Sequence, residues 1–103
     1  MIIDLMIVDK IERGKQVGQR FSFLLNGTVF WSSVGIQKWK GEYKVFVDEV
    51  QEDRMTAEDY QRQEIITFAA IEDALQYIKD CTYAELDKLA PCKGQKIFNP
   101  QSG

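Results

Sequence analysis

The sequence predicts an α+β domain: an antiparallel sheet of four to five strands, arranged as a β-meander, with C-terminal helices packed on one face. Two observations predict this class. Strand-like alternation fills the first half of the chain, whereas the clearest helical spacing follows residue 69. Strands followed by helices are typical of a sheet that helices cover on one face. We expect one domain over residues 1–91 and an irregular tail over residues 92–103.

The pair Asn26-Gly27 is the strongest local signal, because it separates two strand-like runs at 19–25 and 28–36. Both central residues of a two-residue hairpin turn need a positive φ, which Asn and Gly adopt at little steric cost. The turn fixes the register and places Phe23 opposite Phe30. Side chains alternate between faces, so the core face carries Phe21, Phe23, Leu25 and Phe30, and the other face carries Arg20, Ser22, Leu24, Val29, Trp31 and Ser33.

Three further strands are predicted from alternating apolar residues. Residues 2–11 form a first strand that is apolar on both faces, residues 42–50 form a fourth strand after a turn at 37–41, and residues 64–68 form a fifth. Between the fourth and fifth strands, Thr56 and Asp59 resemble a capping box. This pair predicts a short helix that ends near residue 63.

Helices are predicted after the last strand. Apolar residues at helical spacing predict a helix over 70–80 that covers the Phe21/Phe23/Phe30 face with the side chains of Ile71, Ala74, Leu75 and Ile78. Thr82 with Glu85 forms a second capping box and predicts another helix, which Pro91 prevents from extending far.

Composition excludes several kinds of site. The chain has no histidine and two cysteines, so neither Ser-His-Asp or Cys-His catalysis nor a four-ligand zinc site can be built. No glycine-rich motif for a nucleotide is present. We therefore expect no catalytic residue, no cofactor and no metal. The first residues lack the pattern of a signal peptide, and no apolar run reaches the roughly 20 residues of a membrane span. The expected location is the cytoplasm, with reduced thiols.

Charge is segregated along the chain, although the net charge is only -3. Residues 10–44 contain seven basic and two acidic side chains, whereas residues 48–87 contain three basic and twelve acidic ones. Such a separation can steer charged partners, and a solvated helix surface can produce the same counts. The run Asp48, Glu49, Glu52 and Asp53 could hold a hard cation, but it lacks the spacing and the glycine of an EF-hand loop.

Two surfaces are candidate binding sites. The first is apolar and typical of a protein interface unless the tail, the 56–63 helix or a second copy covers it; it consists of Leu24, Val29, Trp31 and Phe46. The second combines cations for phosphates with an aromatic ring for bases, and consists of Arg20, Lys38, Trp39, Lys40 and Lys44. In the alternative interpretation of the second set, Trp39 folds over the sheet edge and lysine stems keep that edge soluble.

Taken together, the residues predict a small non-catalytic protein that binds another protein or a second copy of itself, as a regulator or inhibitor. A nucleic-acid-binding domain is the alternative. An enzyme is disfavoured because no group of residues suggests a reaction, and a membrane partner is not expected.

Overall fold

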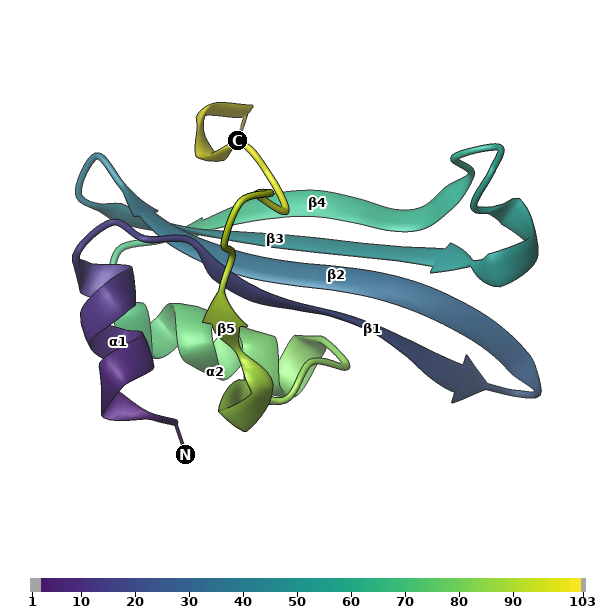
Figure 1. The fold of residues 1–103 in the computed structure, drawn as a ribbon, viewed down its shortest axis with the longest axis horizontal. Coiled ribbons are helices and arrows are strands. Elements are labelled where there is room, and N and C mark those ends of the chain that lie inside the picture. The colour runs from purple at the N-terminus through teal and green to yellow at the C-terminus, as the bar shows by residue number, and fades with distance from the viewer. Residues whose placement is uncertain (1–2, 103) are drawn as a thin grey trace.

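An antiparallel sheet of five strands forms the centre of the fold, which the computed structural model describes for residues 3–102 (Figure 1). The first four strands follow one another as a meander, and the short fifth strand pairs with the start of the first. The strands are β1 (Val17–Leu25), β2 (Thr28–Trp39), β3 (Glu42–Gln51), β4 (Tyr60–Phe68) and β5 (Ala90–Pro91), in the order β4-β3-β2-β1-β5. With two α-helices, α1 (Leu5–Glu12) and α2 (Ile71–Cys81), this confirms the α+β class and the antiparallel sheet.

The β1–β2 hairpin has the predicted register, with Phe23 opposite Phe30. Asn26 and Gly27 have φ angles of 52° and 77°, as a primed two-residue turn requires. Lys40 and Gly41 repeat this geometry between β2 and β3, with φ angles of 52° and 81°. Strand β2 therefore continues to Trp39, and the turn predicted over residues 37–41 is confined to two residues.

Both helices lie on one side of the sheet, which we call the helix face; the opposite side is the open face (Figure 1). Helix α2 shares one core with the middle of the sheet, and its members include Val34, Ile36, Val45, Val47, Ala74, Leu75 and Ile78. Of the phenylalanines predicted beneath α2, Phe21 packs against this core. Phe23 is not covered by α2, because this helix ends at Cys81. It stacks instead on Phe30 and on Tyr83, with ring centres 5.3 and 4.0 Å apart.

The N-terminal segment corrects two predictions, because α1 is a helix and precedes the sheet. Asp4 caps it by accepting a hydrogen bond from the Met6 N–H at 2.8 Å. Ile7 and Ile11, four residues apart, are buried on its inner side. Apolar residues four positions apart lie on one side of a helix and also on one face of a strand, so this spacing alone is compatible with both. The hydrogen bond from Met6 to Asp4 favours the helix. Ile2, part of the predicted strand, lies outside the described residues.

Both predicted capping boxes fail to start an α-helix. After Thr56, Glu58 has a positive φ of 54°, and the chain enters β4 at Tyr60. The Thr82 hydroxyl accepts the Ala84 N–H at 3.1 Å and so forms a turn. The 3-10 helix η2 (Leu86–Lys88) follows. No helix within the described part of the chain has the length and apolar character needed to cross a membrane.

Candidate functional site

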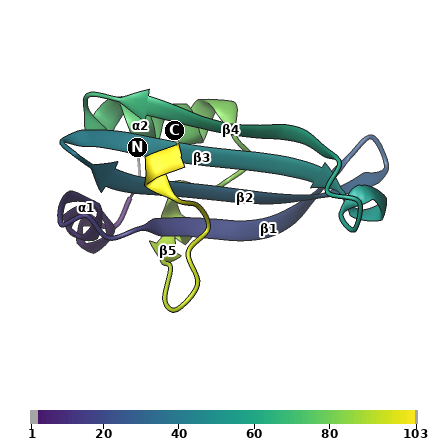
Figure 2. The same ribbon diagram turned by 90° about the horizontal axis from the view of Figure 1, so that it is seen from above.

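The strand register arranges the open face in cross-strand rows. Three consecutive rows toward the Asn26-Gly27 turn contain Gly18, Gly35, Phe46 and Ile65, then Arg20, Ser33, Asp48 and Gln63, then Ser22, Trp31, Val50 and Tyr60. We call the end of the sheet with this turn and the 3-10 helix η1 (Glu52–Arg54) the distal end. Figure 2 looks onto this face, with the end of the chain in front of the sheet and α2 behind it.

The tail, residues 92–102, crosses the open face over the first of these rows (Figures 1 and 2). Two glycines let it come close: a Cβ atom on Gly35 would lie 3.0 Å from the Phe98 ring, and one on Gly18 would lie 2.5 Å from Ile97. Phe98 is buried and stacks on Phe46, with ring centres 5.5 Å apart. The tail therefore covers Phe46, which the sequence placed in an exposed patch.

A buried glutamine fastens the tail. The Gln16 side-chain oxygen accepts the N–H groups of Ile97 and Phe98 at 2.7 and 3.3 Å. Its amide nitrogen donates to the Phe98 carbonyl at 2.8 Å and to Gln37 Oε1 at 2.9 Å. Gln37 in turn donates to the Gly14 carbonyl at 3.0 Å. This network holds a segment that is more than 80 residues away from Gln16 in sequence. No motif in the sequence predicts this contact.

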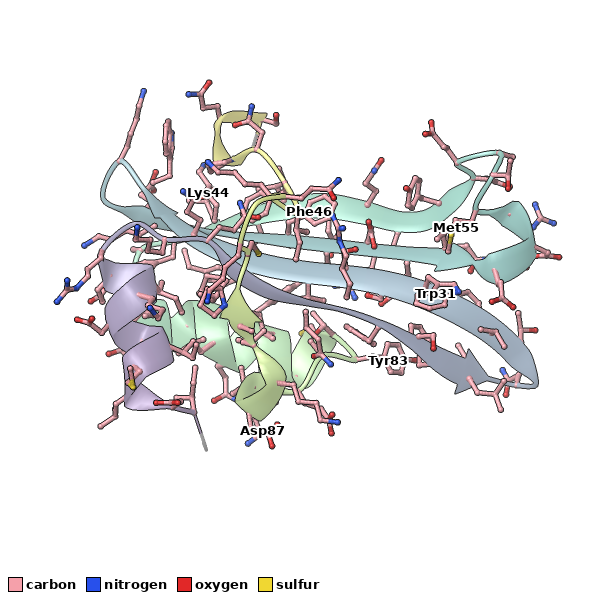
Figure 3. All side chains as sticks on the ribbon, viewed as in Figure 1. Trp31, Lys44, Phe46, Met55, Tyr83 and Asp87 are labelled. Atoms are coloured by element: carbon pink, nitrogen blue, oxygen red, sulfur yellow. The ribbon has the colours of Figure 1, made fainter. Side chains whose placement is uncertain are left out.

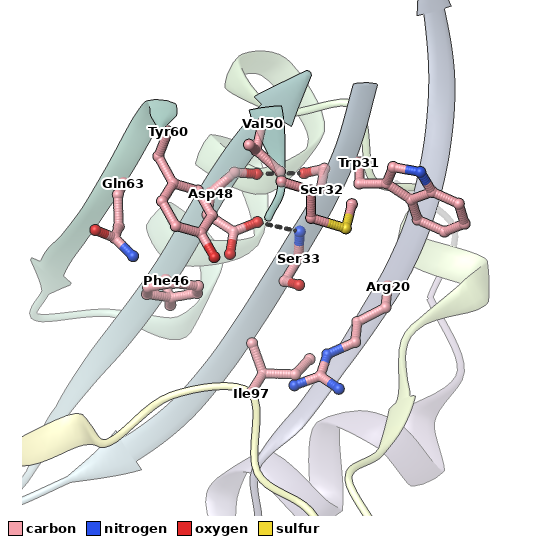
Figure 4. Close-up of a pocket in the computed structure, with 11 residues that line it drawn as sticks. Arg20, Trp31, Ser32, Ser33, Phe46, Asp48, Val50, Tyr60, Gln63 and Ile97 are labelled. Carbon is pink, nitrogen blue, oxygen red and sulfur yellow. Dashed lines mark hydrogen bonds between the residues drawn. The ribbon is translucent and has the colours of Figure 1, made fainter. Parts of the chain in front are cut away.

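A groove of about 430 Å³ lies on the open face, between the tail and the loop after η1 (Figure 4). Ile97 lines it on the tail side, and Met55 lines it on the loop side. Its other lining residues are Arg20, Trp31, Ser32, Ser33, Phe46, Asp48, Val50, Tyr60 and Gln63. The groove thus combines aromatic and aliphatic walls with polar and charged groups in similar proportion.

Asp48 carries a half-buried carboxylate in this groove. Its Oδ1 accepts the Ser33 backbone N–H at 2.6 Å (Figure 4). Burial raises the pKa of Asp48 above its ordinary value of 3.8, although the Ser33 hydrogen bond and the charge of Arg20 oppose the rise. Arg20 is two strands away in the same row, roughly 10 Å across the sheet. Within residues 3–102, Asp48 forms no ion pair.

We expect Asp48→Asn to raise the free energy of unfolding at neutral pH. The raised pKa means that the folded protein binds a proton more tightly than the unfolded chain, so stability falls as pH rises from 3.8 through the folded-state pKa. Asparagine keeps an oxygen that can accept the Ser33 N–H, and it removes the charge. Urea denaturation at pH 7 and near pH 4 measures the difference in the free energy of unfolding between the variant and the wild type. A variant that is less stable than the wild type at pH 7 would contradict the prediction.

The apolar patch lies beyond the groove at the distal end. We call Leu24, Val29, Trp31 and Met55 the distal patch; the first three were predicted from the sequence, and the structure adds Met55. Leu24 is 69% exposed, Trp31 38% and Met55 39%. The Trp31 indole N–H donates to Glu52 Oε1 at 3.2 Å, which fixes the ring beside Met55 (Figure 3). In the part of the chain that the structure describes, no α-helix covers this end of the open face (Figure 1).

The five residues of the basic set are not brought together. Lys38 points to the helix face, where its Nζ lies 3.9 Å from Glu12 Oε1 and 5.7 Å from the ring centre of Tyr43. Lys44 lies on the open face and donates to Thr67 Oγ1 at 2.8 Å. Lys44 lines a shallow hollow with Trp39 and Lys40 on one side of the tail, whereas Arg20 lines the groove on the other side.

Polar groups on the helix face have structural partners. Arg62 on β4 donates to Glu64 at 2.8 Å, to the Tyr77 hydroxyl at 2.7 Å and to the Cys81 carbonyl at 2.6 Å, which ties the end of α2 to the sheet. Hydrogen bonds from Tyr77 and Arg62 hold the pKa of Glu64 below its usual value. This cluster anchors the end of α2 to the sheet.

The acidic run does not converge on one point. Neighbouring strand residues alternate between faces, so Asp48 lies on the open face and Glu49 on the helix face, where Arg62 pairs with it at 3.2 Å. Glu52 and Asp53 follow in η1. Among the described residues, no three His, Cys, Asp or Glu side chains gather around a point that could hold a metal ion.

Comparison of the chain with protein-family models, with curated proteins and with solved structures gives no match. The function is therefore inferred from the open face alone.

Proposed function

We propose that this chain is a non-catalytic protein that binds another protein through the distal end of its open face. The distal patch carries the proposal: apolar side chains lie together at the distal end of the open face, where no α-helix of residues 3–102 covers them. Apolar anchors bordered by polar groups are typical of protein interfaces, and here Glu52 borders the distal patch while Arg20 and Asp48 lie in the adjoining groove. We place the protein in the cytoplasm, where its two free cysteines would remain reduced.

Nucleic-acid binding is the weaker alternative. Phosphate-binding cations and a stacking ring need to follow one track across the surface. Here the tail separates Arg20 from Trp39, Lys40 and Lys44, and Glu12 engages Lys38. The basic set therefore offers a small patch at one end rather than a continuous groove.

The two tryptophans provide a matched test. We expect Trp31→Ala to weaken binding to the partner by about 30-fold or more, since central aromatic anchors contribute about 2 kcal/mol or more. The partner is first identified by affinity capture from the native host and mass spectrometry, and its affinity is then measured by calorimetry. A Trp31→Ala protein that unfolds like the wild type but binds with unchanged affinity would refute the proposal.

Trp39→Ala is the control, because Trp39 lies on the same face at the other end of the sheet. It should leave protein binding unchanged. If instead Trp39→Ala abolishes a salt-sensitive affinity for single-stranded oligonucleotides, the alternative function is correct. A second copy as partner would appear as concentration-dependent dimerisation that Trp31→Ala removes, measured by light scattering.

A further inference from the structure

Among residues 3–102, the carboxylate of Asp48 has no cation in direct contact, and Arg20 in the same row acts on it only at longer range. The carboxylate is half-buried in the groove and accepts one backbone N–H, that of Ser33. Within the described part of the chain, no lysine or arginine nitrogen lies within 4.0 Å of it. A buried charge that is not paired destabilises the folded state, and a cation supplied by a partner would compensate it.

The walls around Asp48 suit a cation with an apolar stem. Phe46, Tyr60 and Trp31 line the groove, and the faces of aromatic rings attract cations. Ile97 and Met55 offer aliphatic surface on its two sides. Lysine and arginine side chains bury their methylene stems against such surface while the charged head meets a carboxylate.

The charges at the distal rim point to the same ligand. The segment over residues 52–59 carries Glu52, Asp53, Glu58 and Asp59 against Arg54, which pairs with Asp59 at 2.7 Å. Arg20 lines the groove from β1, whereas Asp48 and Tyr60 lie on β3 and β4. The β3–β4 side of the groove is therefore acidic and aromatic, and a positively charged group is attracted to it.

We infer that the groove between the tail and the loop after η1 receives a lysine or arginine side chain of the partner protein, with Asp48 as its counter-ion. This inference rests on the proposed protein-binding function and specifies the chemistry of the partner: a basic side chain next to apolar residues that cover the distal patch. Asp48 would select for positive charge, and the exposed part of Trp31 would supply apolar contact.

The test uses Nα-acetyl-arginine amide as a probe for the 103-residue chain. Its neutral isostere, Nα-acetyl-citrulline amide, is the matched probe, and sodium acetate tests for an anion site at Arg20. Nitrogen-15 NMR follows two signals: the Ser33 backbone amide, which donates to Asp48, and the Trp31 indole N–H. The indole signal that remains in the Trp39→Phe protein is that of Trp31. Asp48→Asn is the test variant. Glu42→Gln makes the same change of charge on the open face, on the other side of the tail.

We expect saturable, millimolar binding of the arginine probe with shifts at both signals. Asp48→Asn should weaken this binding about tenfold, in line with the loss of a charge-assisted contact, and Glu42→Gln should leave it unchanged. Equal binding of the citrulline probe, equal binding by the Asp48→Asn protein, or no shift at Ser33 would each overturn the inference. Acetate binding near Arg20 without arginine binding would replace it with an anion site.

The two proposals fail in different ways. If partner binding depends on Trp31 but is unaffected by Asp48→Asn, the protein-binding function stands and the cation site is wrong. If the arginine probe needs Asp48 but no protein partner depends on Trp31, the cation site stands and the protein-binding function is wrong.

Discussion

Leu75→Ala is expected to lower the free energy of unfolding by about 2–5 kcal/mol, the usual cost of truncating a buried leucine. Leu75 is only 4% exposed and lies on the side of α2 that faces the sheet. It belongs to the core that contains Val45 and Val47, which are fully buried. Because these β3 side chains are fixed by strands on both sides, the structure around Leu75 cannot collapse freely into the cavity that alanine leaves.

Chemical denaturation measures this loss. Leu5→Ala is the control, because Leu5 is 80% exposed at the start of α1, and it should change stability by less than about 0.5 kcal/mol. A loss well below about 1 kcal/mol for Leu75→Ala would mean that α2 does not pack on the sheet as described.

The parts of the fold that the sequence predicts are those that local chemistry determines. Asn26-Gly27 sets the turn, the turn sets the register, and the register places Leu24, Val29 and Trp31 together on the open face. Each step uses residues that are neighbours in the chain or across one hairpin. No information from distant parts of the chain is needed.

The errors arise where distant contacts override a local signal. Thr82 begins a capping pattern, but the next residues are drawn to the core: Leu86 and Leu89 are buried, and the Glu85 N–H donates to Gln19 on β1 at 3.1 Å. Thr56 fails because its segment must turn the chain from β3 into β4. A short capping box cannot compete with these tertiary contacts.

The groove could not be predicted because the tail forms one of its walls. The signal that was present is a pair of glycines, Gly18 and Gly35, which lie opposite each other on β1 and β2. An isolated glycine inside a strand often marks the close approach of another segment. Both positions contact the tail, so this signal correctly marks where the tail crosses the sheet. It does not tell which segment makes the contact.

Gln16→Leu is expected to detach the tail and to lower the free energy of unfolding by about 2–4 kcal/mol, because a buried polar group without a partner costs about 1–3 kcal/mol. Leucine has a similar size but can neither accept the N–H groups of Ile97 and Phe98 nor donate to the Phe98 carbonyl. The Gln37 side-chain oxygen would also lose the hydrogen bond that Gln16 donates to it. Urea denaturation measures the loss, and hydrogen exchange at the Ile97 and Phe98 amides reports the tail directly.

Gln101→Leu is the matched control, because it makes the same change at an exposed position of the tail, and it should leave both measurements unchanged. The detached tail would also remove the Ile97 wall of the groove. The Gln16→Leu protein should therefore bind the arginine probe more weakly than the wild type, although Asp48 and Trp31 are intact. If the Ile97 and Phe98 amides exchange as slowly as in the wild type, the tail is held by Phe98 stacking on Phe46 and by the two glycines rather than by Gln16. Gly35→Ala would then be the substitution that releases it, since the added Cβ atom would lie 3.0 Å from the Phe98 ring.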